Sequence, residues 1–258
     1  MILVVEDNDV NQILAIRMLE RRGYRAEAVS DGHQAVEVLE RRRYAAVLMD
    51  CQMPEQNGYD ATGELRLREL GGRHTPVIAM TAHALGGDRE KCLASGMDDY
   101  LAKPLKPEEL DRVLRRWAPR TTKGSDGGAP VVDVLQDDMP AGEGPLDRAG
   151  IERLCSELGS TEALRLPVEL FATQTPELLA DMRRAIEAAD AETARSYAHK
   201  LKGGCMMLAA IHMAELCSEL EFRLGADSLE GAAALVDQIE AAFGEAHAAL
   251  LAEVSCGS

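Results

Sequence analysis

Five residues with ionisable or hydroxyl side chains follow short apolar runs in the first part of the chain. Glu6 and Asp7 follow ILVV, Asp50 follows AVLM, Thr81 follows VIAM, and Lys103 follows LA. Carboxylates brought close together repel one another unless a cation joins them, so a hard divalent metal such as Mg²⁺ is expected. Mg²⁺ completes its coordination shell with water and phosphate oxygens. The cluster has no Gly-rich phosphate-binding loop, which argues against a P-loop nucleotide site.

Five predicted strands position these residues. Apolar runs alternate with helical patterns: the runs lie at Ile2–Val5, Arg25–Val29, Ala45–Met49, Pro76–Met80 and Asp99–Ala102, and the helical patterns at Val10–Arg22, Gln34–Arg42, Tyr59–Leu70, Asp88–Ala94 and Glu108–Arg116. Strict alternation predicts an α/β fold, a doubly wound five-stranded parallel sheet covered on both faces. Ligands of such sheets bind beyond the carboxyl ends of the strands. The five side chains are therefore expected at one edge of the sheet.

The overall composition limits the class of protein. The 258 residues, 46% hydrophobic and 28% charged, are enough for two folded domains. A net charge of −16 and only nine aromatic residues disfavour a nucleic-acid-binding protein, which needs a basic surface. No apolar run has the length of a bilayer span and no secretory signal is recognised, so membrane insertion is not expected. The six scattered cysteines lack metal-ligand spacing and predict reduced thiols in a cytoplasmic protein.

A change in composition divides the chain in two. Residues 119–146 hold four prolines and five glycines without a sustained period, which predicts a flexible linker between domains at 1–118 and 147–258. After the linker only helical patterns occur, at residues 147–158, 163–189, 191–209, 211–224 and 229–254. An all-α antiparallel bundle is the economical way to bury their apolar faces. Pro167 and Pro176 predict that the second helix is kinked or divided, and Asp190 and Ser228 are candidate N-caps.

One histidine of the third helical pattern lies opposite its apolar stripe. At about 100° per residue, the stripe contains Tyr197, Ala198, Leu201, Cys205 and Leu208. His199 points roughly 160° away from it, which predicts an exposed side chain. Lys202 and Met206 are expected on the same outer face, together with Arg195 and Gly203.

The residues around this histidine favour phosphate chemistry. No carboxylate occurs from Thr193 to Ala214, whereas Arg195, Lys200 and Lys202 do occur. Residues 147–258 carry a net charge of −10, so this segment predicts a local positive patch suited to a phosphorylated imidazole. Gly203 and Gly204 each weaken a helix by roughly 0.5–1 kcal/mol relative to Ala. Their presence one turn beyond His199 suggests room for another molecule to approach.

Residues 1–117 resemble a response-regulator receiver domain of the type attached to hybrid histidine kinases. The stretches VVEDNDVNQ, AVLMDCQMPEQNGYDAT, VIAMTAHA and CLASGMDDYLAKPL carry the resemblance in order. It implies a flavodoxin-like fold in which Asp50 is the phosphoacceptor and Glu6, Asp7 and the backbone carbonyl of Gln52 bind Mg²⁺ with it. It further implies that Thr81 binds a phosphoryl oxygen, that Lys103 pairs with its charge, that Tyr100 is the aromatic switch, and that the Lys103–Pro104 peptide bond is cis.

Residues 146–253 resemble a histidine phosphotransfer (Hpt) domain. The carrying motif, HKLKG, begins at His199 and is followed by the helical stretch AELCSELE. The resemblance implies that His199 is a phosphoacceptor and that Lys202 stabilises its phosphate. Gly204 departs from the pattern, since a small hydroxylated residue is usual there. Met206 lies about 20° from His199 on the helical wheel and is a candidate for a receiver-docking patch, with a crevice of the bundle as the alternative.

Together these features predict a phosphorelay protein. A histidine kinase is expected to phosphorylate Asp50, and His199 to exchange phosphoryl groups with Asp50 or with the receiver of a downstream response regulator. The chain contains no recognisable ATP-binding kinase core, so it is not expected to be a kinase itself. Two alternatives stay open. The chain could be the C-terminal part of a hybrid histidine kinase, since Met1 directly precedes the first strand, or it could be an interaction scaffold that works without phosphorylation.

Overall fold

The first part of the chain folds around a five-stranded parallel sheet. The structure, a computed structural model, describes residues 1–53, 56–69, 72, 74–81, 86–119, 144–226 and 228–256. The strands are β1 (Ile2–Val5), β2 (Ala26–Val29), β3 (Ala46–Asp50), β4 (Val77–Thr81) and β5 (Asp99–Ala102). Their order in the sheet is β2-β1-β3-β4-β5, and every neighbouring pair is parallel. This confirms the predicted fold class, and we call this part the sheet domain.

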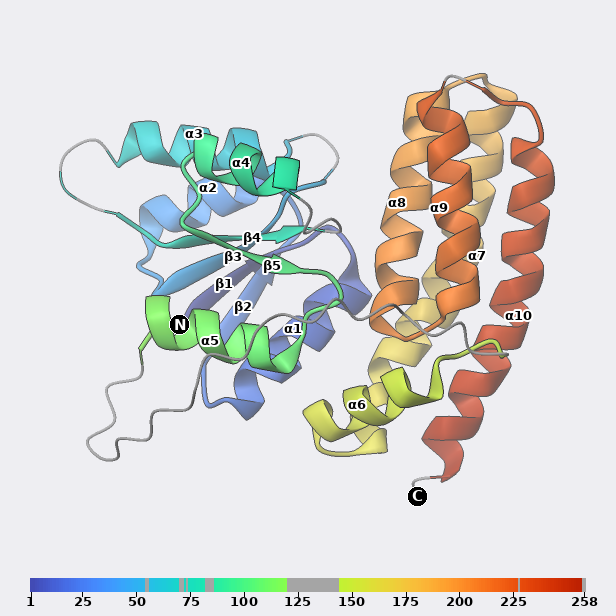
Figure 1. Cartoon of the computed structure of the whole chain (residues 1–258), viewed down its shortest axis with the longest axis horizontal. Helices are drawn as coiled ribbons and strands as arrows, with labels where there is room; N and C mark the ends of the chain where they lie inside the picture. The colour runs from blue at the N-terminus through green and yellow to red at the C-terminus, as the bar shows by residue number, and fades with distance from the viewer. Residues whose placement is uncertain are drawn as a thin grey trace.

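Helices cover both faces of the sheet (Figure 1). They are α1 (Asp9–Arg21), α2 (Gly32–Arg41), α3 (Gly58–Arg68), α4 (Gly86–Ala94) and α5 (Pro107–Trp117). In β1, Ile2 and Val4 belong to the buried cluster on the α1 and α5 side, whereas Leu3 and Val5 belong to the cluster on the α2 and α3 side. Alternate residues of a strand point to opposite faces, so a continuous apolar run can fill two cores.

Side-chain caps fix where several of these helices begin. The side chain of Asn8 accepts hydrogen bonds from the backbone N–H groups of Val10 and Asn11 at the start of α1. Asp31 caps α2 and Asn57 caps α3 in the same way. Such caps satisfy backbone N–H groups that have no partner within the helix. The cap on α1 matters most here, because Glu6 and Asp7 directly precede it.

The second part of the chain is helical throughout its described residues, and we call it the bundle. It contains α6 (Arg148–Leu158), a short 3₁₀ turn η1 (Thr161–Leu164), α7 (Arg165–Glu187), α8 (Ala191–Met207), α9 (Ile211–Gly225) and α10 (Ala232–Cys256). Helices α7 to α10 lie side by side (Figure 1), and three-residue connections join α7 to α8 and α8 to α9. Short connections make consecutive helices antiparallel. The predicted antiparallel bundle is therefore present.

Three details of the bundle test the sequence predictions. The predicted helix at 163–189 is divided into η1 and α7, with Pro167 in the first turn of α7, where a missing N–H costs no hydrogen bond. Asp190 caps α8, as predicted, by accepting from the backbone N–H of Thr193. The proposed cap at Ser228 is wrong, because α10 begins only at Ala232.

The two domains pack against each other through α1. Helix α1 contacts α6, α7 and α8, and its apolar residues Leu14 and Met18 belong to the same buried cluster as Ile151 and Leu164 of the bundle. The sheet domain and the bundle therefore share one continuous apolar core. Whether the domains meet within one chain was left open by the sequence.

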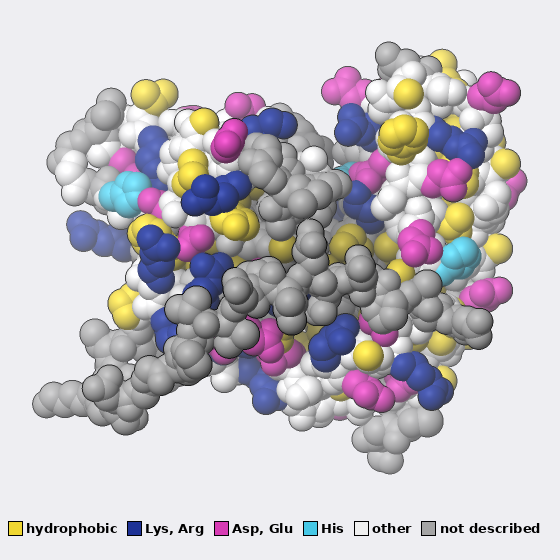
Figure 2. Space-filling view, in the orientation of Figure 1, with side chains coloured by type: hydrophobic (Ala, Val, Ile, Leu, Met, Phe, Trp, Pro, Cys, Tyr) yellow, Lys and Arg dark blue, Asp and Glu magenta, His cyan; other side chains and the backbone are white. Residues whose placement is uncertain are grey.

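The visible surface carries charges of both signs. Figure 2 shows acidic and basic side chains intermixed on the visible faces of both domains. None of the described helices combines the length and the apolarity that a bilayer span requires. Residues 120–143 of the predicted linker lie outside the described residues. The linker and the domain limits therefore stay predictions.

Candidate functional site

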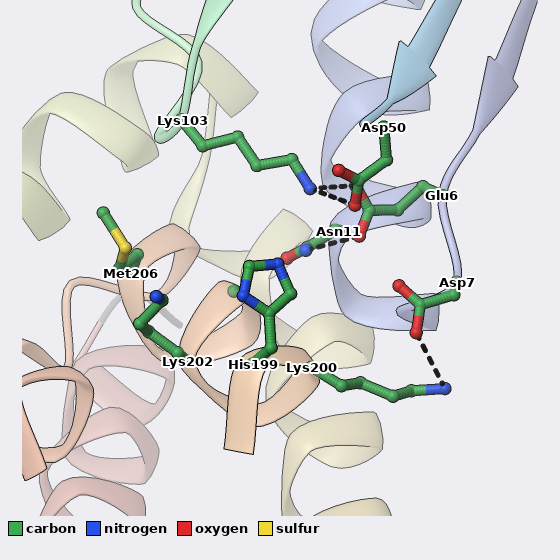
Figure 3. A pocket seen from close by; sticks show the side chains of 10 residues that line it. Glu6, Asp7, Asn11, Asp50, Lys103, His199, Lys200, Lys202 and Met206 are labelled. Carbon is green, nitrogen blue, oxygen red and sulfur yellow. Dashed lines mark hydrogen bonds and ion pairs between the residues drawn. The ribbon is translucent and has the colours of Figure 1, made fainter. Parts of the chain in front are cut away.

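A pocket lies at the junction of the two domains, at the carboxyl ends of the strands. Its lining residues are Glu6, Asp7, Asn11, Asp50 and Lys103 from the sheet domain and His199, Lys200, Lys202, Gly203 and Met206 from α8. Figure 3 shows the imidazole of His199 facing the carboxylates of the sheet domain across this pocket. The two groups that the sequence singled out separately are therefore brought together.

Three carboxylates converge on the sheet side of the pocket. Glu6, Asp7 and Asp50 each offer an oxygen atom, and these atoms lie within 4.8 Å of one another. Burial raises the pKa of Glu6, and the charge of Asp50 adds to this, although Lys103 opposes it. Burial and the charge of Glu6 likewise raise the pKa of Asp7. Buried carboxylates this close favour a bound cation, and three oxygen donors suit a hard divalent metal.

Lys103 supplies a positive charge between two of these carboxylates. Its Nζ lies 2.6 Å from Glu6 Oε2 and 2.6 Å from Asp50 Oδ2. Burial by itself would lower the pKa of Lys103, but the attraction of Asp50 and Glu6 outweighs burial and raises it. The Lys103–Pro104 peptide bond is cis, as the family resemblance implied.

The remaining predicted residues of the sheet domain lie around Asp50. Asp50 is paired in register with Met80, so Thr81 is one residue further along β4, where it is buried. The backbone N–H of Gln52 donates a hydrogen bond to Asp50 Oδ1 at 3.1 Å. Tyr100 is half-buried on β5 and packs against the apolar cluster of the α2 and α3 side. Of the described residues, these three are not among those that line the pocket.

The bundle positions His199 through a carboxylate of the neighbouring helix. His199 Nδ1 lies 2.6 Å from Glu221 Oε1 on α9. This contact leaves Nε2 as the ring nitrogen that can act in the pocket. The prediction of an exposed histidine is wrong in degree, because only 23% of the side chain is exposed. The sheet domain and Glu221 together cover a face that a helical wheel of α8 alone places in solvent.

Lys202 also differs from its prediction. It is buried rather than on the outer face, and its Nζ donates to the second oxygen of Glu221. Burial by itself would raise the pKa of Glu221, but the hydrogen bonds from His199 and Lys202 outweigh burial and lower it. The predicted positive patch is therefore partly neutralised by a residue that the sequence reasoning did not single out. The sequence signal that could have identified Glu221 is its position at the end of the AELCSELE stretch.

The glycines after His199 are contact points for α1. A Cβ atom at Gly203 would lie 3.0 Å from Asn11 Nδ2, and one at Gly204 would lie 3.2 Å from Asn8 Nδ2. The same Asn8 amide donates a hydrogen bond to the backbone carbonyl of Lys200 at 2.9 Å. A close approach at the glycines is thus present, but the approaching residues are Asn8 and Asn11 of the same chain, and the predicted approach of another molecule stays a prediction.

Asn11 hydrogen-bonds to Glu6 and lies against Gly203 of α8, and it was not singled out by the sequence. Its Nδ2 donates to Glu6 Oε1 at 2.8 Å. The neighbouring contact between Lys200 Nζ and Asp7 Oδ2 spans 3.7 Å and pairs opposite charges across the junction. Met206 lines the pocket and also packs against the shared core. Its proposed role in docking stays a prediction.

Comparison with known families and proteins gives consistent matches. Residues 2–115 match the family described as response regulator receiver domain, and residues 168–249 match the family described as Hpt domain. The chain is 33% identical over 229 residues to signal transduction histidine-protein kinase BarA of Shigella flexneri, covering 89% of this chain and 24% of that protein. It is 30% identical over 255 residues to sensor histidine kinase GacS of Pseudomonas protegens, and the match covers 94% of this chain and 26% of that protein. The chain spans about a quarter of the length of these relatives.

Two solved structures are similar to part of this chain in sequence. The receiver domain of sensor histidine kinase PA1611 from Pseudomonas aeruginosa, described with a magnesium ion in its active site cleft, is 58% identical; the match covers 45% of this chain and 94% of that chain, with a TM-score of 0.42. The second is a chain from a complex of the Saccharomyces cerevisiae histidine phosphotransfer protein Ypd1 with the receiver domain of its downstream response regulator Ssk1. It is 26% identical, and the match covers 45% of this chain and 86% of that chain, with a TM-score of 0.42.

Proposed function

The sheet domain belongs to the response regulator receiver family and the bundle to the Hpt family, and on this premise we propose that one phosphoryl group passes between Asp50 and His199 of the same chain. One observation carries this proposal. Both side chains line the same pocket at the domain junction and face each other there. A receiver followed by an Hpt domain is the arrangement of the C-terminal phosphorelay region of hybrid histidine kinases.

Asp50 is suited to accept the phosphoryl group. A carboxylate that attacks phosphorus becomes an acyl phosphate, and the transition state spreads negative charge over the equatorial oxygens. Lys103 is held close enough to pair with that charge, and the backbone N–H of Gln52 is a donor beside Asp50. Thr81 adds a hydroxyl at the end of the adjacent strand. Tyr100 stays a proposed reporter of the phosphorylated state.

His199 is suited to take the group from Asp50. The lone pair of Nε2 forms a bond to phosphorus while the bond from phosphorus to the Asp50 carboxyl oxygen breaks, and the electron pair of that bond returns to the Asp50 carboxylate. Nδ1 keeps its proton throughout and donates a hydrogen bond to Glu221 Oε1, 2.6 Å away. The carboxylate of Glu221 offsets the positive charge that the ring acquires. The reverse steps return the group to Asp50.

The oxygen donors of the sheet domain fit Mg²⁺. Glu6, Asp7 and Asp50 are the residues that would hold it, with the backbone carbonyl of Gln52 as a further proposed ligand. When bound, the ion supplies positive charge to the oxygens of the transferring phosphoryl group. We propose that the bundle depends on the metal site of the receiver that docks on it, since Glu6, Asp7 and Asp50 form the one such acidic group among the described residues.

The chain needs partners at both ends of this transfer. Neither matched family is an ATP-binding kinase core, so we propose that a histidine kinase supplies the phosphoryl group and that the receiver of a response regulator takes it from His199. If the chain is part of a longer hybrid kinase, that kinase core is the donor. A cytoplasmic location stays a prediction.

Labelled acetyl phosphate tests the transfer directly. With Mg²⁺, it should place a hydroxylamine-labile phosphoryl group on Asp50 of the full chain, followed by an acid-labile, base-stable group on His199. The variant Asp50→Asn should carry neither group, and His199→Gln should carry only the first. Base-stable label that persists in His199→Gln would overturn the assignment. Arrival of the same label in Asp50→Asn at the wild-type rate would show that Asp50 is not its source.

A further inference from the structure

The end of α1 that is remote from the pocket makes a second set of contacts with the bundle. Asn8 caps α1 beside the pocket, and the 13 residues of the helix carry the chain to Arg21 and Arg22. At about 1.5 Å per residue, the two ends lie roughly 20 Å apart. The contacts at the remote end are therefore separate from the groups that transfer phosphate.

Arg22 forms an ion pair that crosses the domain junction. Its Nη2 donates to Glu157 Oε2 on α6 at 2.8 Å, and its Nε donates to Asp111 Oδ1 on α5 at 2.6 Å. The side chain of Arg22 is 13% exposed and that of Glu157 is 24% exposed. An ion pair removed from water to this extent is screened less than one at the open surface.

The backbone turn after α6 fits closely around the neighbouring arginine. Gly159 ends α6 with a φ of 87°, and a Cβ atom there would lie 1.9 Å from Arg21 Nη1. A side chain at Gly159 would also be strained at this φ, and the exposed guanidinium of Arg21 would have to shift to make room for it. The carboxyl end of a helix carries partial negative charge, which favours the nearby cations Arg21 and Arg22.

Apolar packing connects these polar contacts. Met18 of α1 lies in the same buried cluster as Ile151 and Leu158 of α6. Helix α6 lies between the two family matches, which end at residue 115 and begin again at residue 168. The contact of α6 with α1 therefore lies outside both matched segments.

We propose that α6 is a selectivity element, which makes the bundle prefer its own sheet domain over the receivers of other proteins. Glu157 and Gly159 recognise an α1 helix that ends in Arg21 and Arg22. While that helix is docked on α6, α7 and α8, another receiver reaches His199 only after the chain's own receiver leaves. The inference rests on the proposed transfer between Asp50 and His199, because selectivity is measured as the rate of phosphotransfer to His199.

Transfer between two copies of the full chain tests this selectivity. The donor chain carries His199→Gln and is phosphorylated on Asp50 with acetyl phosphate, which is then removed. The acceptor chain carries Asp50→Asn, so base-stable label on it arises only by transfer between chains. Adding Arg22→Glu to the acceptor removes the ion pair with Glu157 and so weakens the docking of its own sheet domain. Transfer between chains should then rise about 10-fold.

A matched control and a folding control accompany this variant. Arg17 lies on the same helix, is 54% exposed and pairs with Glu20. Arg17→Glu in the acceptor should therefore change transfer by less than about twofold. A chain with Arg22→Glu and native Asp50 should retain its helicity and accept phosphate from acetyl phosphate at the wild-type rate. If Arg22→Glu unfolds the sheet domain beside Asp111, Arg22→Gln replaces it, with an expected rise of about threefold.

Charge exchange completes the test. An acceptor with Glu157→Arg should receive phosphate slowly from a donor with native Arg22 and faster from a donor with Arg22→Glu. Unchanged transfer in a folded Arg22→Glu acceptor, or an equal gain from Arg17→Glu, would overturn the selectivity proposal. Failure of the proposed transfer itself looks different, because then no acceptor carrying His199 gains base-stable label.

Discussion

The two proposed phosphoacceptors lie in ion clusters of opposite composition. In the sheet domain one cation, Lys103, is shared by two carboxylates, Glu6 and Asp50. In the bundle one carboxylate, Glu221, is shared by two basic side chains, His199 and Lys202. The first cluster has a surplus of negative charge and the second does not. Docking therefore places a cluster with surplus negative charge opposite a cluster without such a surplus.

This difference separates the tasks of the two domains. The sheet domain has oxygen donors that could hold a metal and a buried ammonium group, and in the proposed function these stabilise the phosphoryl group during its transfer. The bundle has His199, the proposed nucleophile, and the carboxylate of Glu221 that holds it. Removing Lys103 should therefore impair the chemistry of the first cluster, whereas removing Glu221 should impair the orientation of His199 in the second. Changes at Lys103, Asp7 and Glu221 test that division, and a change at Gly203 tests the fit between the clusters.

The largest effect is expected from Lys103→Ala. Loss of the ammonium group leaves Glu6 and Asp50 buried beside each other without their cation. We expect phosphorylation by acetyl phosphate to fall by roughly 10²–10³-fold. The free energy of unfolding without Mg²⁺ should fall by about 3 kcal/mol. Lys106→Ala, an exposed lysine nearby, is the control and should change neither quantity. Equal rates in the two variants would remove Lys103 from the transfer chemistry.

The next effect is expected from Asp7→Asn, which alters the metal site and leaves Lys103 in place. Mg²⁺ affinity measured by calorimetry should fall by about 10-fold or more, since a charged oxygen ligand becomes a neutral one. The rise in melting temperature that Mg²⁺ gives the wild-type chain should shrink correspondingly. Asp9→Asn changes an exposed carboxylate two residues away and serves as the control. Unchanged affinity in Asp7→Asn would contradict the assigned ligands.

A moderate effect is expected from Glu221→Gln in the bundle. Transfer from Asp50 to His199 should slow by about 10-fold, because the amide holds the imidazole less firmly and does not offset its charge. Phosphorylation of Asp50 itself should be unchanged. Glu219→Gln, on the same helix but 49% exposed, should have little effect on either step. A loss of Asp50 phosphorylation in Glu221→Gln would mean that the two clusters do not have separate tasks.

Glu221 also gives the bundle a pH dependence with a definite sign. Its pKa in the folded bundle lies below the ordinary value of 4.5, so the carboxylate adds stability above that pH. The added stability is lost as the pH falls below 4.5 and through the folded pKa. Chemical denaturation between pH 6 and pH 3 should therefore show a smaller acid-induced loss of stability in Glu221→Gln than in the wild type.

The smallest effect is expected from Gly203→Ala, which tests the fit between the clusters. The new Cβ would lie 3.0 Å from Asn11 Nδ2, so docking must loosen slightly. Transfer to His199 should fall about threefold, while the helix gains roughly 0.5–1 kcal/mol. Gly244→Ala on α10 meets no atom within 4 Å and should give the stability gain alone. Faster transfer in Gly203→Ala would contradict the close-approach role of this glycine.

The sequence predicted the sheet side of the site more completely than the bundle side, for a physical reason. In a parallel sheet the carboxyl end of every strand lies at the same edge, so a side chain that follows a strand is placed by the strand alone. Glu6, Asp50 and Lys103 meet as that rule predicts. The strands differ from their predicted limits by no more than one residue at either end.

A helix surface has no comparable rule. A helical wheel gives the direction of His199 relative to its own helix, but does not say which neighbour lies in that direction. Glu221 was missed and Lys202 was placed in solvent because both outcomes depend on how α8 packs against α9. The docking of the two domains depends in turn on contacts such as Asn8 with Lys200, between residues 192 positions apart in the chain.

The apolar core that the two domains share through α1 has a consequence for how the protein unfolds. Leu14 and Met18 lie in one buried cluster with residues of the bundle. Opening either domain alone would expose apolar surface that belongs to both, so the free energy of that local opening includes part of the other domain. The backbone amides of α1 should therefore exchange hydrogen with solvent more slowly than those of α2 or α3. Thermal unfolding of the chain should therefore be more cooperative than that of two domains joined only by a flexible linker.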